Sequence, residues 1–393
     1  MEKDDYSLVF VSNYFNHHQK PLSDALYALT KGNYSFITTG EMSSEREKLG
    51  YCRYYSVDYV LQYNDAREKC DDLIARATVL IIGSAPDELI KERLRNGKLT
   101  FRYSERLYKA GFQWKNFLRN MISAWIHHGR YQRYPLYMLC ASGFTSADCA
   151  RFGNYKGRCF KWGYFPETKR YENLQLILSS KKKNSILWVG RLIPLKHPDD
   201  VITVARCLKE RGYSFEINMI GSGEMEKQLR AMLTEFDLND CVHLLGAMKP
   251  NEVRQYMEQS GIFLFTSDKN EGWGAVLNEA MNSACAVIAS HSIGSVPFLV
   301  RHNENGLVFK QQDTNMLRCH TEYLLEHPKV QERLGRKAYV SIQKEWNAEV
   351  AAERFIQLTQ STEKKVNGTI FDDGPCSKAG LIKDDWFIDE KYS

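Results

Sequence analysis

The chain has 393 residues, of which 43% are hydrophobic and 26% are charged. This composition excludes a disordered protein, and the length predicts two globular domains. The net charge of +5 is too small to indicate a nucleic-acid-binding protein, but it favours anionic substrates or an anionic membrane surface.

The ten cysteines form no Cys-x-x-Cys pair, which argues against a zinc site and favours buried thiols in a reducing compartment. The charged start of the chain does not resemble a signal peptide, and no run of about 18 apolar residues predicts a membrane span. We therefore expect a cytoplasmic protein.

In the first half of the chain, short apolar runs alternate with amphipathic segments. Strands are expected at 8–11, 79–82 and 137–140, and a helix at 21–29. This alternation predicts a parallel sheet with helices on both faces. The basic run at 179–184 is interpreted as the linker between two domains, although a charged surface loop within one domain has the same composition.

The second half shows the same alternation more clearly and predicts a second doubly wound domain. Strands are expected at 186–189, 215–220, 242–245, 262–265 and 286–289, with helices at 198–210, 224–235, 250–258, 276–284 and from 314 to 360. The predicted domains are residues 1–180 and 184–345, followed by a helix at 346–363 that crosses back to the first domain and a tail at 364–393. Ligands of such domains bind outside the carboxyl ends of the strands.

Two cations follow the first strand of the second domain. This strand ends at Gly190 and Arg191, and Lys196 comes five residues later. The glycine permits a tight turn, so both cations can point toward one ligand. Two fixed cations suit a diphosphate, whose charge they offset when a nucleotide leaves. Taken alone, the same spacing is equally typical of solvated surface cations.

Glycines mark the end of the next strand. Gly221 and Gly223 precede a helix, where backbone N–H groups can approach a phosphate or a sugar. A single Gly-x-Gly is a weak signal, because any tight strand-to-helix turn can use it.

The most specific motif has two glutamates at either end. Glu271 is expected in a loop, where a carboxylate can accept hydrogen bonds from sugar hydroxyls, and Glu279 one turn into a helix, within reach of ribose hydroxyls. Gly274, Ala275 and Val276 lie between them and present N–H groups at the helix start, where anions bind.

Together these motifs resemble the donor domain of the group 1 (family 4) retaining glycosyltransferases, of the type found in bacterial surface-polysaccharide synthesis. The similarity covers residues 186–308. It implies the α/β fold named GT-B, with two facing Rossmann-like doubly wound domains and the active site in the cleft between them. It also implies retention of anomeric configuration and no metal or other cofactor, in agreement with the lack of an Asp-x-Asp triplet near a strand end.

The resemblance assigns roles to individual residues. Arg191 and Lys196 hold the donor phosphates, Glu271 contacts the transferred sugar, Glu279 contacts the ribose, and the segment 244–248 borders the base. The donor-binding residues expected in this way are Gly190, Arg191, Lys196, Gly221, Gly223, Leu245, Met248, Glu271, Trp273, Gly274, Ala275, Val276 and Glu279.

The acceptor is expected to bind the first domain. The loop after its first strand carries Asn16, His17, His18 and Gln19, which are candidates for binding acceptor or donor sugar. A histidine here, His17 foremost, can act as a base toward an acceptor hydroxyl. Helix capping and packing explain the same residues equally well.

A second candidate base departs from the family pattern. Where many relatives carry a histidine after the corresponding strand, this chain has Ser104, Glu105 and Arg106. We expect Glu105 to be catalytic, together with His17 and Glu271, and Ser104 and Arg106 to contact the acceptor, as we do Asn16, His18 and Gln19. The alternative is that Ser104 caps a helix.

A basic, aromatic stretch follows. Seven basic residues and one acid between positions 102 and 133 give it a net charge of +6, and large apolar residues are interleaved. This pattern suits a membrane surface or a lipid-diphosphate acceptor, and it is equally typical of a core helix with a solvated basic face.

The sequence thus predicts a hexosyltransferase that acts in polysaccharide biosynthesis. A UDP- or GDP-sugar is the expected donor and a saccharide or lipid-linked molecule the acceptor, with peripheral contact to the inner face of an anionic membrane and no nucleic acid partner. A nucleotide-sugar epimerase of the same fold and a non-catalytic sugar-nucleotide-binding subunit remain as alternatives. A dehydrogenase is disfavoured, because no Gly-x-Gly-x-x-Gly follows the first strand.

Overall fold

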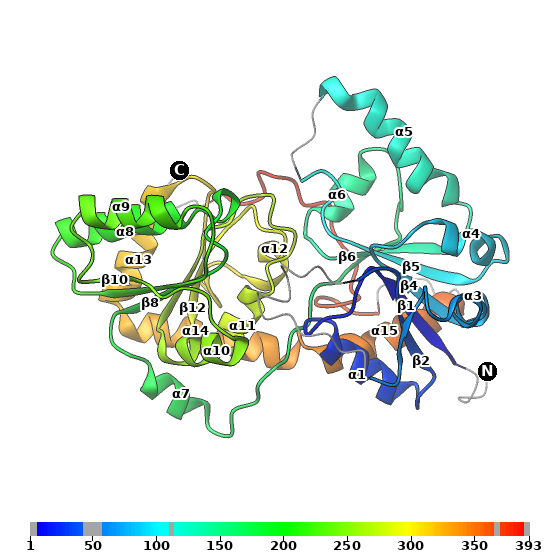
Figure 1. Cartoon of the computed structure of the whole chain (residues 1–393), viewed down its shortest axis with the longest axis horizontal. Coiled ribbons are helices and arrows are strands. Elements are labelled where there is room, and N and C mark those ends of the chain that lie inside the picture. The colour runs from blue at the N-terminus through cyan, green and yellow to red at the C-terminus, as the bar shows by residue number, and fades with distance from the viewer. Residues whose placement is uncertain (1–5, 42–56, 110–113, 365–369, 389–393) are drawn as a thin grey trace. The chain divides into compact units, whose positions relative to one another are not determined.

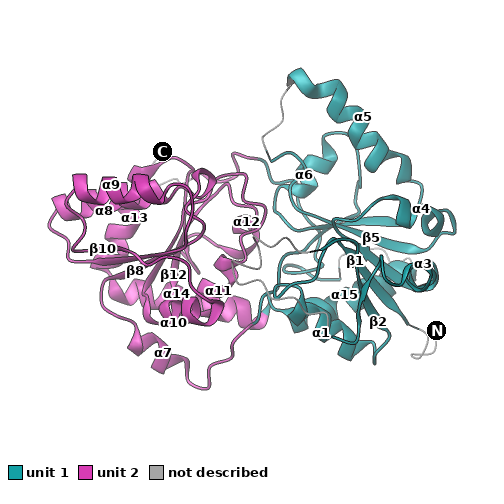
Figure 2. Ribbon diagram, in the orientation of Figure 1, with its two compact units in different colours: residues 1–167, 345–383 teal, residues 168–344, 384–393 magenta. Residues whose placement is uncertain are grey.

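The computed structural model describes residues 6–41, 57–109, 114–364 and 370–388. The chain forms two compact units, drawn in teal and magenta in Figure 2. Unit 1 comprises residues 1–167 and 345–383, and unit 2 comprises residues 168–344 and 384–393.

The described part of unit 1 contains a parallel seven-stranded sheet in the order β3-β2-β1-β4-β5-β6-β7. Every residue of β1 and β4 is buried, which is typical of central strands covered on both faces. The strands are β1 (Leu8–Ser12), β2 (Tyr34–Thr38), β3 (Val60–Gln62), β4 (Val79–Ile82), β5 (Leu99–Ser104), β6 (Leu136–Cys140) and β7 (Cys159–Lys161).

Helices cover both faces of this sheet (Figure 1). They are α1 (Lys20–Leu29), α3 (Arg67–Arg76), α4 (Glu88–Arg95), α5 (Phe117–His127), α6 (Thr145–Ala150) and α15 (Ala348–Glu363). α1 packs beside α15, and α3 packs beside α4. The helix that the sequence predicts at 346–363 is α15, whose Phe355 contacts Phe101 of β5 and Trp162.

The described part of unit 2 contains a parallel six-stranded sheet in the order β10-β9-β8-β11-β12-β13. Its strands are β8 (Ser185–Val189), β9 (Glu216–Ile220), β10 (Val242–Leu244), β11 (Ile262–Phe265), β12 (Ala286–Ser290) and β13 (Leu307–Phe309). In each unit the strand order reverses next to the first strand, which is the doubly wound arrangement predicted from the sequence.

Two helical layers enclose the second sheet (Figure 1). The layer of α8 (Pro198–Glu210), α9 (Glu226–Glu235) and α13 (Thr314–Glu326) lies on one face; that of α7 (Leu174–Ser180), α10 (Pro250–Gln259), α11 (Val276–Asn282) and α14 (Pro328–Lys344) lies on the other. The short α12 (Val296–Leu299) follows β12. Among the described residues, no helix is both long and apolar enough to cross a bilayer.

The run at 179–184 does not divide the two units. The division lies between Glu167 and Thr168, ahead of the predicted boundary, and α7 packs on α10 and α14 within unit 2. The reason is Lys181, whose partly buried Nζ donates hydrogen bonds to the carbonyl oxygens of Met257, Ser260 and Ser283 at 2.7–3.2 Å. The basic run therefore contains a structural lysine.

The described part of the tail packs on the molecule. Residues 376–378 run antiparallel to β7, with hydrogen bonds from the Lys161 N–H to the Ser377 carbonyl and from the Cys376 N–H to the Lys161 carbonyl, both 2.8 Å. Further along, the Trp386 indole N–H donates to the His291 carbonyl of unit 2 at 2.9 Å.

Candidate active site

The loop after β8 is fastened to the end of β11, its neighbour in the sheet. The Thr266 hydroxyl donates to the Lys196 carbonyl at 2.6 Å and accepts a hydrogen bond from the Trp188 indole at 3.0 Å. The Asp268 N–H donates to the Leu195 carbonyl at 2.9 Å. These bonds fix the backbone of Lys196 at the carboxyl edge where strand order reverses, the position at which such sheets bind ligands.

A direct ion pair joins Lys196 to Glu271, and both side chains are 14% exposed. The sequence placed both residues in the donor site but did not predict that they pair with each other across 75 positions. Arg191, the second predicted cation, has an exposed side chain. The edge thus combines a paired ammonium and carboxylate with a guanidinium open to solvent.

The glycines after β9 let two loops pass closely. Gly221 has φ +143°, and a Cβ there would lie 1.8 Å from the Gly190 carbonyl oxygen; a Cβ on Gly223 would lie 2.4 Å from the Leu192 carbonyl oxygen. The Gly221 N–H already donates to the Gly246 carbonyl at 2.8 Å. Gly221 is needed for loop packing, and the contact of this turn with a donor phosphate stays a prediction.

Trp273 does not line a ligand site. Its side chain is fully buried, and its indole N–H donates to Asn278 Oδ1 at 2.9 Å. The bulky ring anchors the motif in the core beside Phe298. Gly274, with φ +81°, passes so close to Phe265 that a Cβ would lie 2.3 Å from its ring. The prediction of donor contact by Trp273 is corrected to a structural role.

The remaining predicted donor residues stand at strand and helix ends. Ala275 is buried directly before α11, and Val276 is its first residue. Leu245 and Met248 are half-buried after β10, and Leu245 donates its N–H to the Met219 carbonyl. Their contacts with a nucleotide stay predictions.

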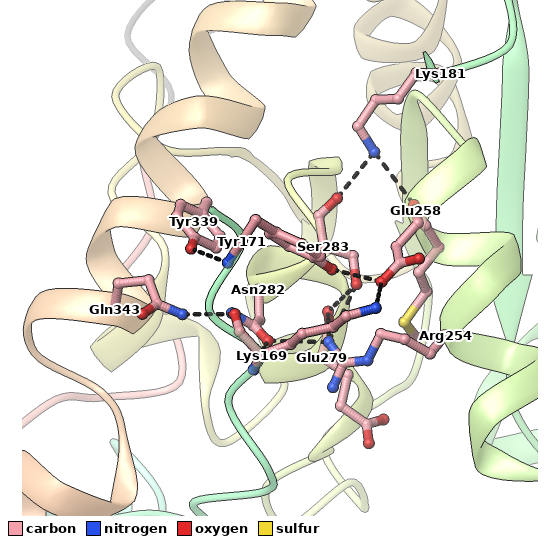
Figure 3. A network of polar contacts seen from close by, with 11 residues as sticks. Lys169, Tyr171, Lys181, Arg254, Glu258, Glu279, Asn282, Ser283, Tyr339 and Gln343 are labelled. Carbon is pink, nitrogen blue, oxygen red and sulfur yellow. Dashed lines mark hydrogen bonds and ion pairs between the residues drawn. The ribbon is translucent and has the colours of Figure 1, made fainter. Parts of the chain in front are cut away.

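Glu279 sits on a helix whose far end is clamped by Arg254 (Figure 3). Arg254 Nη1 donates to the Glu279 carbonyl, Asn282 Oδ1 and Ser283 Oγ, each at 3.1 Å. The Glu279 carboxylate points away from this guanidinium in Figure 3. Asn282 in turn exchanges hydrogen bonds with the backbone of Lys169 at 2.8 and 3.1 Å. The network holds α11, and with it Glu279, in one orientation.

One feature of this edge was missed in the sequence. His197, directly after Lys196, has a left-handed backbone and lies 3.6 Å from the Asp268 carboxylate and 3.9 Å from that of Asp200. Burial raises the pKa of Asp200 to about 6. Only its position next to the lysine of the motif could have indicated His197.

At the carboxyl end of β1 in unit 1, the side chains of Asn16 and Gln19 form hydrogen bonds within the turn that precedes α1. The Asn16 N–H donates to Gln19 Oε1 at 2.9 Å, and Asn16 Oδ1 accepts from the His18 N–H at 2.8 Å. Asn16 is buried. These bonds hold the two side chains within the turn, and their contact with an acceptor stays a prediction.

The rings of His17 and His18 lie against each other at a tilt of 46°, with centroids 3.9 Å apart. Burial lowers the pKa of His18 to about 4, so its imidazole is neutral at pH 7. The catalytic role of His17 stays a prediction.

Glu105 lies just beyond β5 in a polar chain. Its carboxylate accepts a hydrogen bond from the Tyr164 hydroxyl at 2.6 Å and pairs with Lys109 at 2.5 Å. Tyr103 also faces Tyr164, and burial raises the pKa of both phenols far above the usual range. The two neutral phenols and Lys109 surround a carboxylate at the carboxyl edge of the sheet.

The neighbours of Glu105 have other roles. Arg106 is buried, lies 3.5 Å from the Asp148 carboxylate and covers the ring of Phe144, so the expectation that it contacts the acceptor is wrong. Ser104 donates from its hydroxyl to the Glu105 carbonyl at 2.9 Å. Residues 105–109 are not helical, so Ser104 caps no helix here.

Comparison with known proteins identifies the second unit. Residues 170–341 match the family model of the glycosyl transferases group 1. The amylovoran biosynthesis glycosyltransferase AmsK of Erwinia amylovora is 34% identical over 150 residues, which cover 37% of this chain and 37% of that protein. A trehalose synthase of Pyrococcus horikoshii is 28% identical over 189 residues, covering 46% of this chain and 44% of that protein. The chain thus spans less than half the length of these curated relatives.

The fold extends beyond the matched region. The crystal structure of Anabaena Alr3699/HepE in complex with UDP aligns with a TM-score of 0.67 at 13% identity, covering 91% of this chain and 100% of that chain. At this identity the likeness concerns the fold alone, and it confirms the predicted pair of Rossmann-like domains known as GT-B.

Proposed function

We propose that the whole protein is a glycosyltransferase acting in polysaccharide biosynthesis, and the match of residues 170–341 to the family model of the glycosyl transferases group 1 supports this proposal. It transfers a hexose from a nucleotide-sugar donor to a saccharide or lipid-linked acceptor, without a metal. The similarity to the amylovoran enzyme AmsK supports the class of product.

The ion pair between Lys196 and Glu271 carries this proposal. It fixes a cation and a carboxylate at the ligand-binding edge of the unit that matches the family. The diphosphate of the donor draws Lys196 toward its own oxygens, with Arg191 as the second cation. The freed Glu271 carboxylate then accepts hydrogen bonds from hydroxyls of the transferred sugar.

Both cations act on the departing nucleotide. The bond between the anomeric carbon and the diphosphate oxygen breaks, and its electron pair stays on the diphosphate, whose charge Lys196 and Arg191 offset. The acceptor oxygen forms the new bond on the same face of the sugar, so the configuration is retained, and the acceptor loses its proton. Glu279 holds the ribose from α11.

Unit 1 supplies the acceptor site and the base. Glu105 is the better candidate for the base, because Lys109 and Tyr164 keep its carboxylate in place. His17 is the other candidate, while the neutral His18 beside it supports packing. We place the protein in the cytoplasm, at the inner face of the membrane where lipid-linked acceptors lie.

Turnover by single-residue variants tests the donor site. Lys196→Ala and Glu271→Ala are each expected to lower the rate of sugar release or transfer by about a hundredfold or more, because each removes a group that acts on the reacting sugar nucleotide. The rate is measured with UDP-, GDP- and ADP-sugars. UDP-glucose is tried first, because HepE was crystallised with UDP.

Lys209→Ala is the matched control, since this lysine forms ion pairs at the opposite end of α8 and is more exposed. Unaltered turnover in both site variants rejects the site. Release of an epimerised nucleotide sugar in the absence of an acceptor would show that the protein is an epimerase and not a transferase. Binding of a nucleotide sugar without any turnover would favour the non-catalytic subunit.

A further inference from the structure

The helix α5 of unit 1 has an apolar face turned to solvent. Leu118, Met121, Ile122 and Trp125 follow the i, i+3, i+4, i+7 spacing and are 67%, 41%, 55% and 61% exposed. The sequence left open whether this stretch is a core helix with a solvated basic face. The structure excludes that alternative, because the apolar side of α5 is its exposed side.

The helix is held in place without using this face. Ala124 is its buried residue, and the His127 imidazole at its end lies 2.9 Å from the Asp87 carboxylate. His128, which follows the helix, contacts the Tyr155 hydroxyl at 3.1 Å. In Figure 1 the helix accordingly stands apart from the sheet of its own unit. These contacts hold α5 in place while its apolar stripe faces the solvent.

The segment that contains the stripe carries charge of one sign. Residues 106–133 include six lysines and arginines and no aspartate or glutamate. Lys115 and Arg119 are exposed at the start of α5, and Arg133 is exposed beyond its end. A second copy of this chain would bring the same positive charge against itself, so the occupant of the stripe is apolar and anionic.

We propose that α5 docks the protein on a lipid bilayer with anionic headgroups. The four apolar side chains enter the boundary between headgroups and acyl chains, and the flanking cations bind lipid phosphates. The tryptophan is the residue type that favours this boundary. The inference rests on the proposed function in one respect: a docked unit 1 would meet a lipid-linked acceptor in the membrane.

Sedimentation with vesicles tests the docking. The full-length protein is expected to bind phosphatidylglycerol-containing vesicles and not pure phosphatidylcholine vesicles. Leu118→Ser/Trp125→Ser lowers the partition coefficient at least about tenfold, because two side chains no longer enter the membrane. Lys115→Gln/Arg119→Gln lowers it about fivefold for each charge removed, and added salt has the same direction of effect.

The control is Leu176→Ser/Leu381→Ser, whose apolar side chains are 67% and 66% exposed but lie elsewhere. Equal loss in this control and the stripe variant overturns the proposal, as does absence of wild-type binding to anionic vesicles. A wild-type dimer that the stripe variant makes monomeric also overturns it, because a second copy then covers α5.

Thermal shift with UDP-, GDP- and ADP-sugars, in the absence of vesicles, separates this inference from the proposed function. Retained nucleotide-sugar response with no vesicle binding rejects only the docking surface. Vesicle binding that depends on the stripe, without any nucleotide-sugar response, rejects only the transferase.

Discussion

At the residue scale, the proposed function requires the pair of Lys196 and Glu271 to open when a donor binds. Both side chains are only 14% exposed, so the contact is largely shielded from solvent. Its two members are matched in charge to the two parts of a sugar nucleotide, a diphosphate and a set of hydroxyls. A bound donor would therefore replace the ion pair by two contacts, one from Lys196 to the diphosphate and one from Glu271 to the sugar hydroxyls.

His18 gives a prediction for stability against pH. Its pKa of about 4 in the folded protein lies below the ordinary 6.5, because burial disfavours the charged imidazole. The unfolded chain therefore binds the proton more tightly, and protonation favours unfolding as the pH falls from about 6.5 to 4. In this window the wild type should lose up to about 3 kcal/mol of unfolding free energy relative to His18→Gln.

Urea unfolding of both proteins at several pH values measures this difference. It should be constant above the window and again below it. His327→Gln, which replaces an exposed histidine, serves as the comparison. A wild-type and His18→Gln difference that does not vary with pH would show that His18 is not desolvated.

At the element scale, the sequence predicted the second unit well. The strands expected at 262–265 and 286–289 are β11 and β12, and the helix expected at 198–210 is α8. These runs are long, apolar and periodic. β2, β3 and β13 were missed, because β2 mixes polar with apolar residues and β3 and β13 are only three residues long.

The contacts of the site were harder to predict than its elements. Lys196 and Glu271 are distant in sequence, so their pairing depends on how two loops pack. Trp273 and Arg106 belong to residue types that also bind ligands, and only burial shows that they support the core. A motif identifies which turn matters, whereas tertiary packing decides which of its side chains face a ligand.

The basic run at 179–184 gives a prediction for the stability of the packing between α7, α10 and α11. Lys181→Met should lower the free energy of unfolding by about 2 kcal/mol, because three carbonyl oxygens lose their charged donor. Lys182 and Lys183 are exposed neighbours of the same type, and their methionine variants should stay within about 0.5 kcal/mol of wild type.

Urea unfolding measures all three variants. Equal changes in the free energy of unfolding at the three positions would contradict the structural role of Lys181. The basic run would then be a solvated surface segment.

At the scale of the whole molecule, the family match covers fewer residues than the shared fold. The family model covers residues 170–341, most of unit 2, whereas the doubly wound topology also includes unit 1. Nucleotide-sugar donors are one class of ligand, so a single motif set can serve many enzymes. The family match therefore supports the proposal for the donor site, whereas the acceptor roles proposed for unit 1 lie outside the matched residues.

The tail gives the last prediction, because its two parts contact different units. Residues 376–378 supply hydrogen-bonding partners to β7, an edge strand of unit 1, and Trp386 contacts unit 2. Deleting residues 370–393 should therefore remove the protection of the Lys161 amide against hydrogen exchange and lower the stability of unit 1 by about 2–4 kcal/mol. Deleting only 384–393 keeps the partners of β7 and should leave that amide protected. Hydrogen exchange followed by mass spectrometry compares the two deletions, and equal exchange at β7 would mean that the edge strand is stable without the tail.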